Sequence, residues 1–214
     1  MTASGKVKLK PGDTIGILGG GQLGRMLAMA AARLGLRCQV FSPDPDSPAF
    51  DVVLNATCAE YADVEALELF ANDVDVITYE FENVPAATAM VLAARRPVLP
   101  AQKSLETTQD RLIEKDFVKR LGIGTADYAD VSSVEDLRAA IAKIKDALGD
   151  VSVLVNNAAR DDRHRMEEVT VEYWDERLAV NLRHQFFAAQ ACVEHMKRLG
   201  GGSIEQALGD ELGD

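Results

Sequence analysis

The sequence predicts an α/β fold with a mostly parallel sheet and helices on both faces. Short apolar runs alternate with longer amphipathic segments along most of the 214 residues. The first apolar run ends in glycines, as a buried strand does when a helix follows it. Hydrophobic residues make up 47% of the chain and charged residues 27%, which is typical of a globular protein with a sizeable core.

The N-terminal part begins with a strand–helix–strand unit. Thr14–Leu18 is an apolar run typical of a buried parallel strand. Gln22–Leu34 is rich in Ala, Leu and Met and predicts a helix, with Gly35 placed to end it. Arg37–Phe41 predicts the second strand, which a Pro/Asp cluster terminates. The length of this unit is typical of a mononucleotide-binding half, so the expected architecture is Rossmann-like.

The same alternation continues toward the C-terminus. Helices are expected where apolar residues recur at helical spacing, and strands where short apolar runs lie between turn signals. The expected helices are Asp63–Ala71, Pro85–Ala94, Gln109–Leu121, Val134–Leu148 and Val171–Leu199. The expected strands are Val74–Thr78, Val98–Leu99, Tyr128–Val131, Val151–Val155 and one that starts at Ser203. Glu205–Asp214 is acidic, follows no strand pattern, and predicts a short helix or a tail.

The net charge of −11 argues against binding to nucleic acid or to an anionic membrane surface. Cys38, Cys58 and Cys192 have no metal-ligand spacing and are interpreted as small core residues, so no metal site is expected. The N-terminal residues lack the apolar stretch of a signal peptide, and no apolar run is long enough to span a membrane. A cytoplasmic location is the expectation.

A glycine-rich turn follows the first expected strand, with Gly19, Gly21 and Gly24 in a GxGxxG pattern. Glycines let the backbone approach an anion closely, and the helix that follows offers free N–H donors. The pattern predicts a phosphate-binding turn; the alternative is a close-packed strand–helix turn with no ligand. Asp44 and Asp46 lie about 20 residues further on, where a dinucleotide site places its acidic residue, but they sit in a proline-rich turn.

Four motifs in order, GILGGGQLGRML, FSPDPDSPA, ITYEFENVP and QDRLIEKDFVKRLGI, resemble the N-terminal domain of the N5-carboxyaminoimidazole ribonucleotide synthase family. These enzymes of purine biosynthesis belong to the ATP-grasp superfamily, and the resemblance covers about residues 12–141. It implies that the glycine turn holds a phosphorylated ribonucleotide, which Gln22 and Leu23 would contact. It further implies that Glu80 binds the ribose or amine of that ligand and that Arg111 touches ATP.

The chain departs from this family after the shared motifs. The family needs a large ATP-grasp domain that clamps ATP and holds magnesium. Residues 142–214 contain neither a glycine-rich ATP lid nor a late cluster of acidic metal ligands. Without these groups the charge of phosphoryl transfer is not stabilised, so ligase activity is not expected.

A second set of motifs, VLVNNAA, YW and AVNL, resembles the middle of a short-chain dehydrogenase/reductase over about residues 129–204. This resemblance implies that Asn156 and Ala158 border an NAD(P) cofactor, that Asp130 and Val131 lie near its adenine, and that Asn181 supports a proton relay. The family's catalytic serine and its YxxxK pair are absent, so we predict no catalytic residue and leave both ATP and NAD(P) open as cofactors.

The sequence therefore predicts a chimera, arisen by design or by recombination, that keeps phosphate or ribonucleotide binding at the glycine turn without a complete catalytic site. The alternatives are a fragment of the ATP-dependent synthase and an NAD(P)-binding protein of reductase type. The expected organisation is 1–128 as a Rossmann half, 129–204 completing the same sheet, and 205–214 as an acidic tail. The reductase resemblance also implies a homodimer through the Val171–Leu199 helix.

Overall fold

A computed structural model describes residues 7–160 and 165–206 of the chain. The chain divides into two compact units, residues 1–125 and 126–214, which we call the N-terminal and C-terminal units. Each unit has its own sheet and its own hydrophobic core. The two units are therefore described separately.

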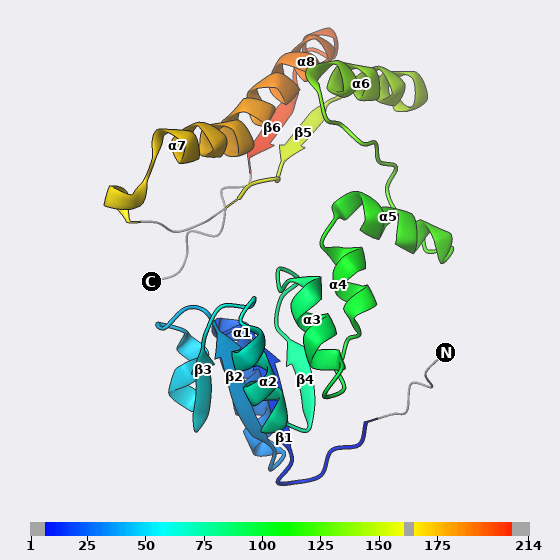
Figure 1. Cartoon of the computed structure of the whole chain (residues 1–214). Coiled ribbons are helices and arrows are strands. Elements are labelled where there is room, and N and C mark those ends of the chain that lie inside the picture. Colours follow the sequence, from blue (N-terminus) through cyan, green and yellow to red (C-terminus); the bar gives the residue numbers. More distant parts are fainter. Residues whose placement is uncertain (1–6, 161–164, 207–214) are drawn as a thin grey trace. The chain divides into compact units, whose positions relative to one another are not determined.

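The N-terminal unit contains a four-stranded parallel sheet in the order β3-β2-β1-β4 (Figure 1). The strands are β1 (Thr14–Leu18), β2 (Arg37–Ser42), β3 (Asn55–Cys58) and β4 (Val76–Tyr79). β1 lies between β2 and β4, so the order reverses at β1 after the chain has passed through β2 and β3. Open α/β sheets bind ligands beside such a reversal, at the carboxyl ends of the strands.

Helices cover both faces of this sheet, as the sequence predicts. They are α1 (Gln22–Arg33), the 3-10 helix η1 (Pro48–Val52), α2 (Val64–Asn72), α3 (Ala86–Ala93), α4 (Gln102–Thr108) and α5 (Arg111–Arg120). Neighbouring residues of β1 point to opposite faces: Ile17 packs in a cluster with Ala28 of α1, and Leu18 packs in a cluster with Phe70 of α2. This alternation is the two-residue period of a strand buried on both sides.

Local signals in the sequence set the ends of several helices. Gly35 follows α1 with a φ of 74°, a conformation that a residue with a Cβ rarely adopts. Asp63 accepts a hydrogen bond from the Ala66 N–H at 3.0 Å and caps α2. Asp110 accepts from the backbone N–H groups of Leu112 and Ile113, both at 2.9 Å, so α5 begins at Arg111.

The C-terminal unit packs helices against a two-stranded parallel sheet. Its elements are α6 (Val134–Leu148), β5 (Val153–Asn156), the 3-10 helix η2 (Met166–Glu168), α7 (Val171–Leu178), the π-helix η3 (Ala179–Arg183), α8 (His184–Arg198) and β6 (Ser203–Gln206). Its core cluster consists of Ile141, Cys192 and Met196, with four partly buried apolar side chains around them.

The organisation differs from the expected single sheet. Strands β5 and β6 pair with each other, with Val153 opposite Ser203, and they form a sheet separate from β1–β4. Residues 128–131, where a strand was expected, form no strand. The expectation that residues 129–204 complete the N-terminal sheet is therefore wrong.

Several elements were missed or misplaced for physical reasons. Strand β3 is a short edge strand with mostly exposed, polar residues, so it lacks an apolar run. Helix α4 contains three threonine or serine residues and only one leucine, Leu105, which is fully buried. The expected strand at Val98–Leu99 is reduced to one bridge between Val98 and Ile77. Glu205 and Gln206 belong to β6 rather than to a tail, and residues 207–214 lie outside the described residues.

Asp150, in the turn after α6, is expected to stabilise the C-terminal unit in a pH-dependent way. The Arg198 guanidinium donates to both carboxylate oxygens, with Nη2–Oδ1 at 2.6 Å and Nε–Oδ2 at 3.0 Å, and these hydrogen bonds hold the pKa of Asp150 below its ordinary 3.8. A depressed folded-state pKa gives stability that is present above 3.8 and is lost as the pH falls through the lower folded value.

Asp150→Asn should therefore destabilise the unit at neutral pH, and the difference from the wild type should shrink as the pH falls below 3.8. Urea unfolding followed by Trp174 fluorescence measures this, because Trp174 is the single tryptophan and lies in the C-terminal unit. Asp146→Asn is the matched control, since Asp146 is exposed on α6 and makes no ion pair within the described residues. A constant difference across this pH range would contradict the assignment.

Candidate functional site

The glycine turn and Glu80 meet at the reversal of strand order. The glycine turn follows β1, and Glu80 follows β4, which is the parallel neighbour of β1. Both segments therefore lie at the carboxyl ends of adjacent strands. This is the edge at which open α/β sheets bind ligands.

The carboxylate of Glu80 occupies the backbone N–H groups of the glycine turn. Gly21 N–H donates to Oε1 at 2.7 Å, and Gly24 N–H donates to Oε2. Gly24 lies in the first turn of α1, and the N-terminus of a helix favours negative charge. The chain's own carboxylate thus stands where the GxGxxG pattern predicted an external phosphate.

Two glycines are required for this arrangement. Gly19 has a φ of 104°, and a Cβ there would lie 2.4 Å from Glu80 Cγ. A Cβ on Gly24 would lie 2.7 Å from the backbone oxygen of Gly19. The glycine pattern therefore serves close packing between the turn and Glu80, and phosphate binding by the turn stays a prediction.

The turn still offers donors to a ligand. Gln22 and Leu23 are the first two residues of α1, so their N–H groups have no acceptor within the helix. Both residues are exposed, and the first turn of α1 contains no acidic residue. Two N–H groups without a helical acceptor therefore lie next to a fixed carboxylate.

Glu80 and Arg111 line one cavity of about 360 Å³. The resemblance assigned Glu80 to the ribonucleotide and Arg111 to ATP, and the fold brings the two residues together from the end of β4 and the start of α5. Arg111 forms an ion pair with Glu114 and is largely exposed. Glu82 and Glu114 also line the cavity and were not predicted as site residues. Glu82 lies in the same YEFEN motif as Glu80, and this proximity in the sequence could have identified it as a site residue.

The pKa of Tyr61 depends on the negative charge of Glu80. Its pKa is raised from 10.0 to about 12, first by burial and second by the negative charge of Glu80. Since the neutral phenol is favoured in the folded state, this contribution to stability is present below pH 10 and is lost as the pH rises toward 12.

We expect a tyrosinate absorbance titration of the folded protein to show one of its four tyrosines ionising near pH 12. Glu80→Gln should lower that pKa, because it removes the second cause, whereas Glu82→Gln should leave it closer to the wild-type value. An unchanged Tyr61 pKa in Glu80→Gln would contradict the placement of Glu80.

The residues predicted from the reductase resemblance are not brought into one site by the observed contacts. Asn156 is buried at the end of β5, and Ala158 is exposed in the loop that follows. The amide of Asn181 is occupied by the backbone of Arg160: Oδ1 accepts from the Arg160 N–H at 2.8 Å and Nδ2 donates to the Arg160 carbonyl at 3.0 Å. Asn181 thus fixes the loop after β5 to the π-helix.

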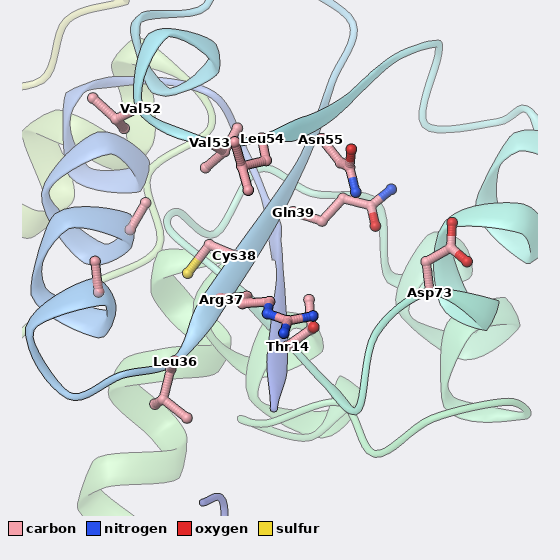
Figure 2. A pocket seen from close by; sticks show the side chains of 12 residues that line it. Thr14, Leu36, Arg37, Cys38, Gln39, Val52, Val53, Leu54, Asn55 and Asp73 are labelled. Atoms are coloured by element: carbon pink, nitrogen blue, oxygen red, sulfur yellow. The ribbon is translucent and has the colours of Figure 1, made fainter. Parts of the chain in front are cut away.

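A cavity of about 520 Å³ lies at the amino ends of β1 and β2, beginning at Thr14 and Arg37 (Figure 2). Cys38 lies on the side of β2 that faces α1, whereas Gln39 and Asn55 lie on the opposite side. Burial raises the pKa of the Cys38 thiol. This cavity is at the edge of the sheet opposite to the glycine turn, and its lining was not predicted.

Metal-binding clusters and membrane-spanning helices are both absent from the described residues. Within those residues, no group of three or more His, Cys, Asp or Glu side chains is arranged to hold a metal ion. No helix in the described part of the chain has the length and apolar character required to cross a membrane.

Family models match the two parts of the chain. Residues 13–109 match the ribonucleotide synthetase preATP-grasp domain, and residues 106–206 match the short chain dehydrogenase model. The two models thus match successive parts of the chain. We refer below to the synthase-like unit (residues 1–125) and the dehydrogenase-like unit (residues 126–214).

Curated relatives of the synthase-like unit act in purine synthesis by their names. The N5-carboxyaminoimidazole ribonucleotide synthase of Brucella melitensis is 51% identical over 136 residues, which is 64% of this chain and 38% of the relative. The bifunctional purine synthesis protein purC/E of Dictyostelium discoideum is 48% identical over 64% of this chain and 14% of the relative. The chain thus spans well under half the length of the relatives that it matches.

Solved structures agree with the mixed α/β fold of the synthase-like unit. The ADP complex of an N5-carboxyaminoimidazole ribonucleotide synthetase aligns with a TM-score of 0.60 and 38% identity, covering 64% of this chain and 36% of that chain. The synthetase from Thermus thermophilus aligns with a TM-score of 0.56 and 45% identity, covering 61% of this chain and 36% of that chain. The synthase-like unit is therefore similar in sequence and fold to about a third of each of these synthetases.

Proposed function

We propose that the synthase-like unit binds a phosphorylated ribonucleotide at the glycine turn, with Glu80 as the acceptor for the sugar hydroxyls. The single observation that carries this proposal is the pair of hydrogen bonds that Gly21 and Gly24 donate to Glu80. They fix a carboxylate at the carboxyl ends of β1 and β4, where it keeps lone pairs for ligand hydroxyl donors.

The site offers different groups to the phosphate and to the sugar of such a ligand. A phosphate is repelled by Glu80 and cannot use the N–H groups of Gly21 and Gly24 while the carboxylate holds them. The N–H groups of Gln22 and Leu23 are available to it instead, and the N-terminus of α1 attracts its charge. Arg111, in the cavity beside Glu80, would serve a nucleotide phosphate once it left Glu114.

Relatives support a ligand of this class. One aligned structure, from Aspergillus clavatus, is described as a complex with ADP and 5-aminoimidazole ribonucleotide; it is 28% identical, with a TM-score of 0.54, over 65% of this chain and 37% of that chain. This chain spans 37% of that synthase, and the proposal concerns binding of the ribonucleotide alone.

We infer in addition that the chain is a chimera of the two families. Their matches meet at residues 106–109, and the boundary between the compact units falls at residues 125–126. The segment around Val134 begins with a capped helix, Ser133 accepting from the Asp136 N–H at 3.1 Å, which is compatible with either parent. A joint at such a place keeps the local geometry of both parents.

Thermal unfolding of the full chain, followed by circular dichroism, tests the binding proposal. A ligand that binds only the folded state stabilises it by about 2.7 kcal/mol at a hundredfold excess over Kd. We expect 5-aminoimidazole ribonucleotide to raise the unfolding temperature, and inorganic phosphate and NADH at equal concentrations to have much smaller effects. No shift with the ribonucleotide, or an equal shift with inorganic phosphate, would overturn the proposal.

A further inference from the structure

The peptide group between Gly20 and Gly21 is held at both of its polar ends. The Gly20 carbonyl accepts a hydrogen bond from the Ala49 N–H at 2.9 Å, and the Gly21 N–H donates to Glu80 Oε1 at 2.7 Å. Ala49 belongs to η1 and Glu80 follows β4, so two segments far apart in the sequence fix one peptide plane. The next N–H group along the chain, that of Gln22, is one that the proposed ligand would use, so its direction depends on how this plane is held.

Two buried serines anchor the start of η1 beside this peptide group. Ser42 ends β2 and Ser47 precedes η1, and each residue is only 4% exposed. Their hydroxyl groups are hydrogen-bonded to each other at 2.8 Å, and Ser47 Oγ donates to the Asp44 carbonyl at 2.7 Å. The Asp44 N–H donates to Ser42 Oγ at 3.4 Å, which closes a ring of three hydrogen bonds. We call Ser42, Asp44 and Ser47 the serine ring.

The serine ring packs directly on Gly20. A Cβ on Gly20 would lie 2.2 Å from Ser47 Oγ and 2.9 Å from Ser42 Cβ, so the ring leaves no room for a side chain at this position. Gly20 does not have a positive φ, so the close contact with the ring, and not the backbone conformation, requires glycine here. The turn is thus held by Glu80 at Gly21 and by the serine ring at Gly20.

We propose that Ser47 is a positioning residue of the ribonucleotide site, which acts through the serine ring and Ala49 to hold the Gly20–Gly21 peptide group in the orientation that binds the ligand. This inference rests on the proposed function. A buried hydrogen-bond network rigidifies its surroundings when its members are satisfied. Donors that are fixed before binding also spare the complex the cost of ordering the turn. Loss of the Ser47 hydroxyl opens the ring and should therefore weaken ligand binding in a protein that is still folded.

Isothermal titration of 5-aminoimidazole ribonucleotide into the full chain tests this role, at a temperature where circular dichroism shows every variant to be folded. We expect Ser47→Ala to weaken binding about tenfold. Thr88→Val is the matched control, because Thr88 is 3% exposed and its hydroxyl donates to the Tyr61 carbonyl at 2.8 Å. Tyr61 packs in the cluster on the α2 face of the sheet, whereas Ala49 packs in the cluster on the α1 face. Thr88→Val should therefore bind within about threefold of the wild type.

Amide hydrogen exchange of the Ala49 N–H, followed by NMR, gives a readout that does not need the ligand. Ser47→Ala should exchange this hydrogen at least about tenfold faster than Thr88→Val, because the open ring no longer holds Ala49 against the Gly20 carbonyl. A loss of global stability alone would affect both variants alike. Equal exchange in the two variants would overturn the link between the serine ring and the turn.

Ser42→Ala opens the same ring at a second point and keeps the hydrogen bond from Ser47 to Asp44, so this milder variant decides the question if Ser47→Ala does not fold. It should weaken binding at least about threefold. Because both substitutions break one ring, the double variant should bind no more than about threefold more weakly than Ser47→Ala. Losses that multiply, or serine variants that bind like the wild type, would overturn this inference alone. A wild type that does not bind the ribonucleotide would overturn the proposed function and this inference with it.

Discussion

Replacing Gly24 by alanine is expected to lower the free energy of unfolding of the synthase-like unit by about 2–3 kcal/mol. The added Cβ would lie 2.7 Å from the backbone oxygen of Gly19 and 3.0 Å from Glu80 Oε2. The first atom belongs to the backbone of the turn and cannot rotate away, so the turn and helix α1 must separate. Urea unfolding followed by far-UV circular dichroism measures the loss, and the Trp174 signal separates it from unfolding of the other unit.

Gly124→Ala is the matched control for this substitution. A Cβ added at Gly124 would have no heavy atom within 4 Å, and Gly124 does not have a positive φ, so alanine there should be neutral or slightly stabilising. Equal stability of Gly24→Ala and Gly124→Ala would mean that the turn is not packed as described.

Replacing Glu80 by alanine should cost about 1.5–3 kcal/mol of stability, although Glu80 is a polar residue at the edge of the sheet. The loss arises because the N–H groups of Gly21 and Gly24 lose a charged acceptor at the N-terminus of α1. The value is lower than for two fully buried hydrogen bonds, since Glu80 is only partly buried and water can replace it. The same urea experiment measures the effect.

Glu82→Ala provides the comparison for Glu80→Ala. Glu82 lines the same cavity, carries the same charge and is exposed, and its side chain makes no hydrogen bond within the described residues. Its removal should change stability by less than about 0.5 kcal/mol. If the two variants were equally stable, the hydrogen bonds of Glu80 would have no structural role.

The predicted helices and strands of the synthase-like unit agree closely with the observed ones, because short local sequence patterns specify them. The apolar run before the glycines, Gly35 after α1 and the capping residues Asp63 and Asp110 specify elements without reference to the rest of the chain. Strand β3 was not predicted, because an exposed edge strand needs no apolar face and therefore has no apolar run in its sequence. The separate sheet of β5 and β6 could not be foreseen, since strand partners depend on contacts that sequence patterns do not encode.

The candidate site was predictable in its residues but not in their contacts. The motifs identified Gly19–Gly24, Glu80 and Arg111, and the fold brings Glu80 to both the turn and the cavity of Arg111. The pattern could not show that Glu80 takes the N–H groups otherwise assigned to phosphate, because this requires the pairing of β1 with β4. In the dehydrogenase-like unit, Asn181 was recognised, but its two hydrogen bonds to the backbone of Arg160, 21 residues earlier, were not predicted.

The most direct test of the proposed site is isothermal titration of 5-aminoimidazole ribonucleotide into the wild type, Glu80→Gln and Glu82→Gln, with folding of each variant confirmed by circular dichroism. If Glu80 accepts the sugar hydroxyls, Glu80→Gln should weaken binding at least about tenfold, which is about 1.4 kcal/mol, while Glu82→Gln stays within about threefold of the wild type. Unchanged or tighter binding by Glu80→Gln would contradict this account. Unchanged binding would mean that Glu80 does not contact the ligand, and tighter binding would mean that Glu80 competes with the ligand for the N–H groups of the glycine turn.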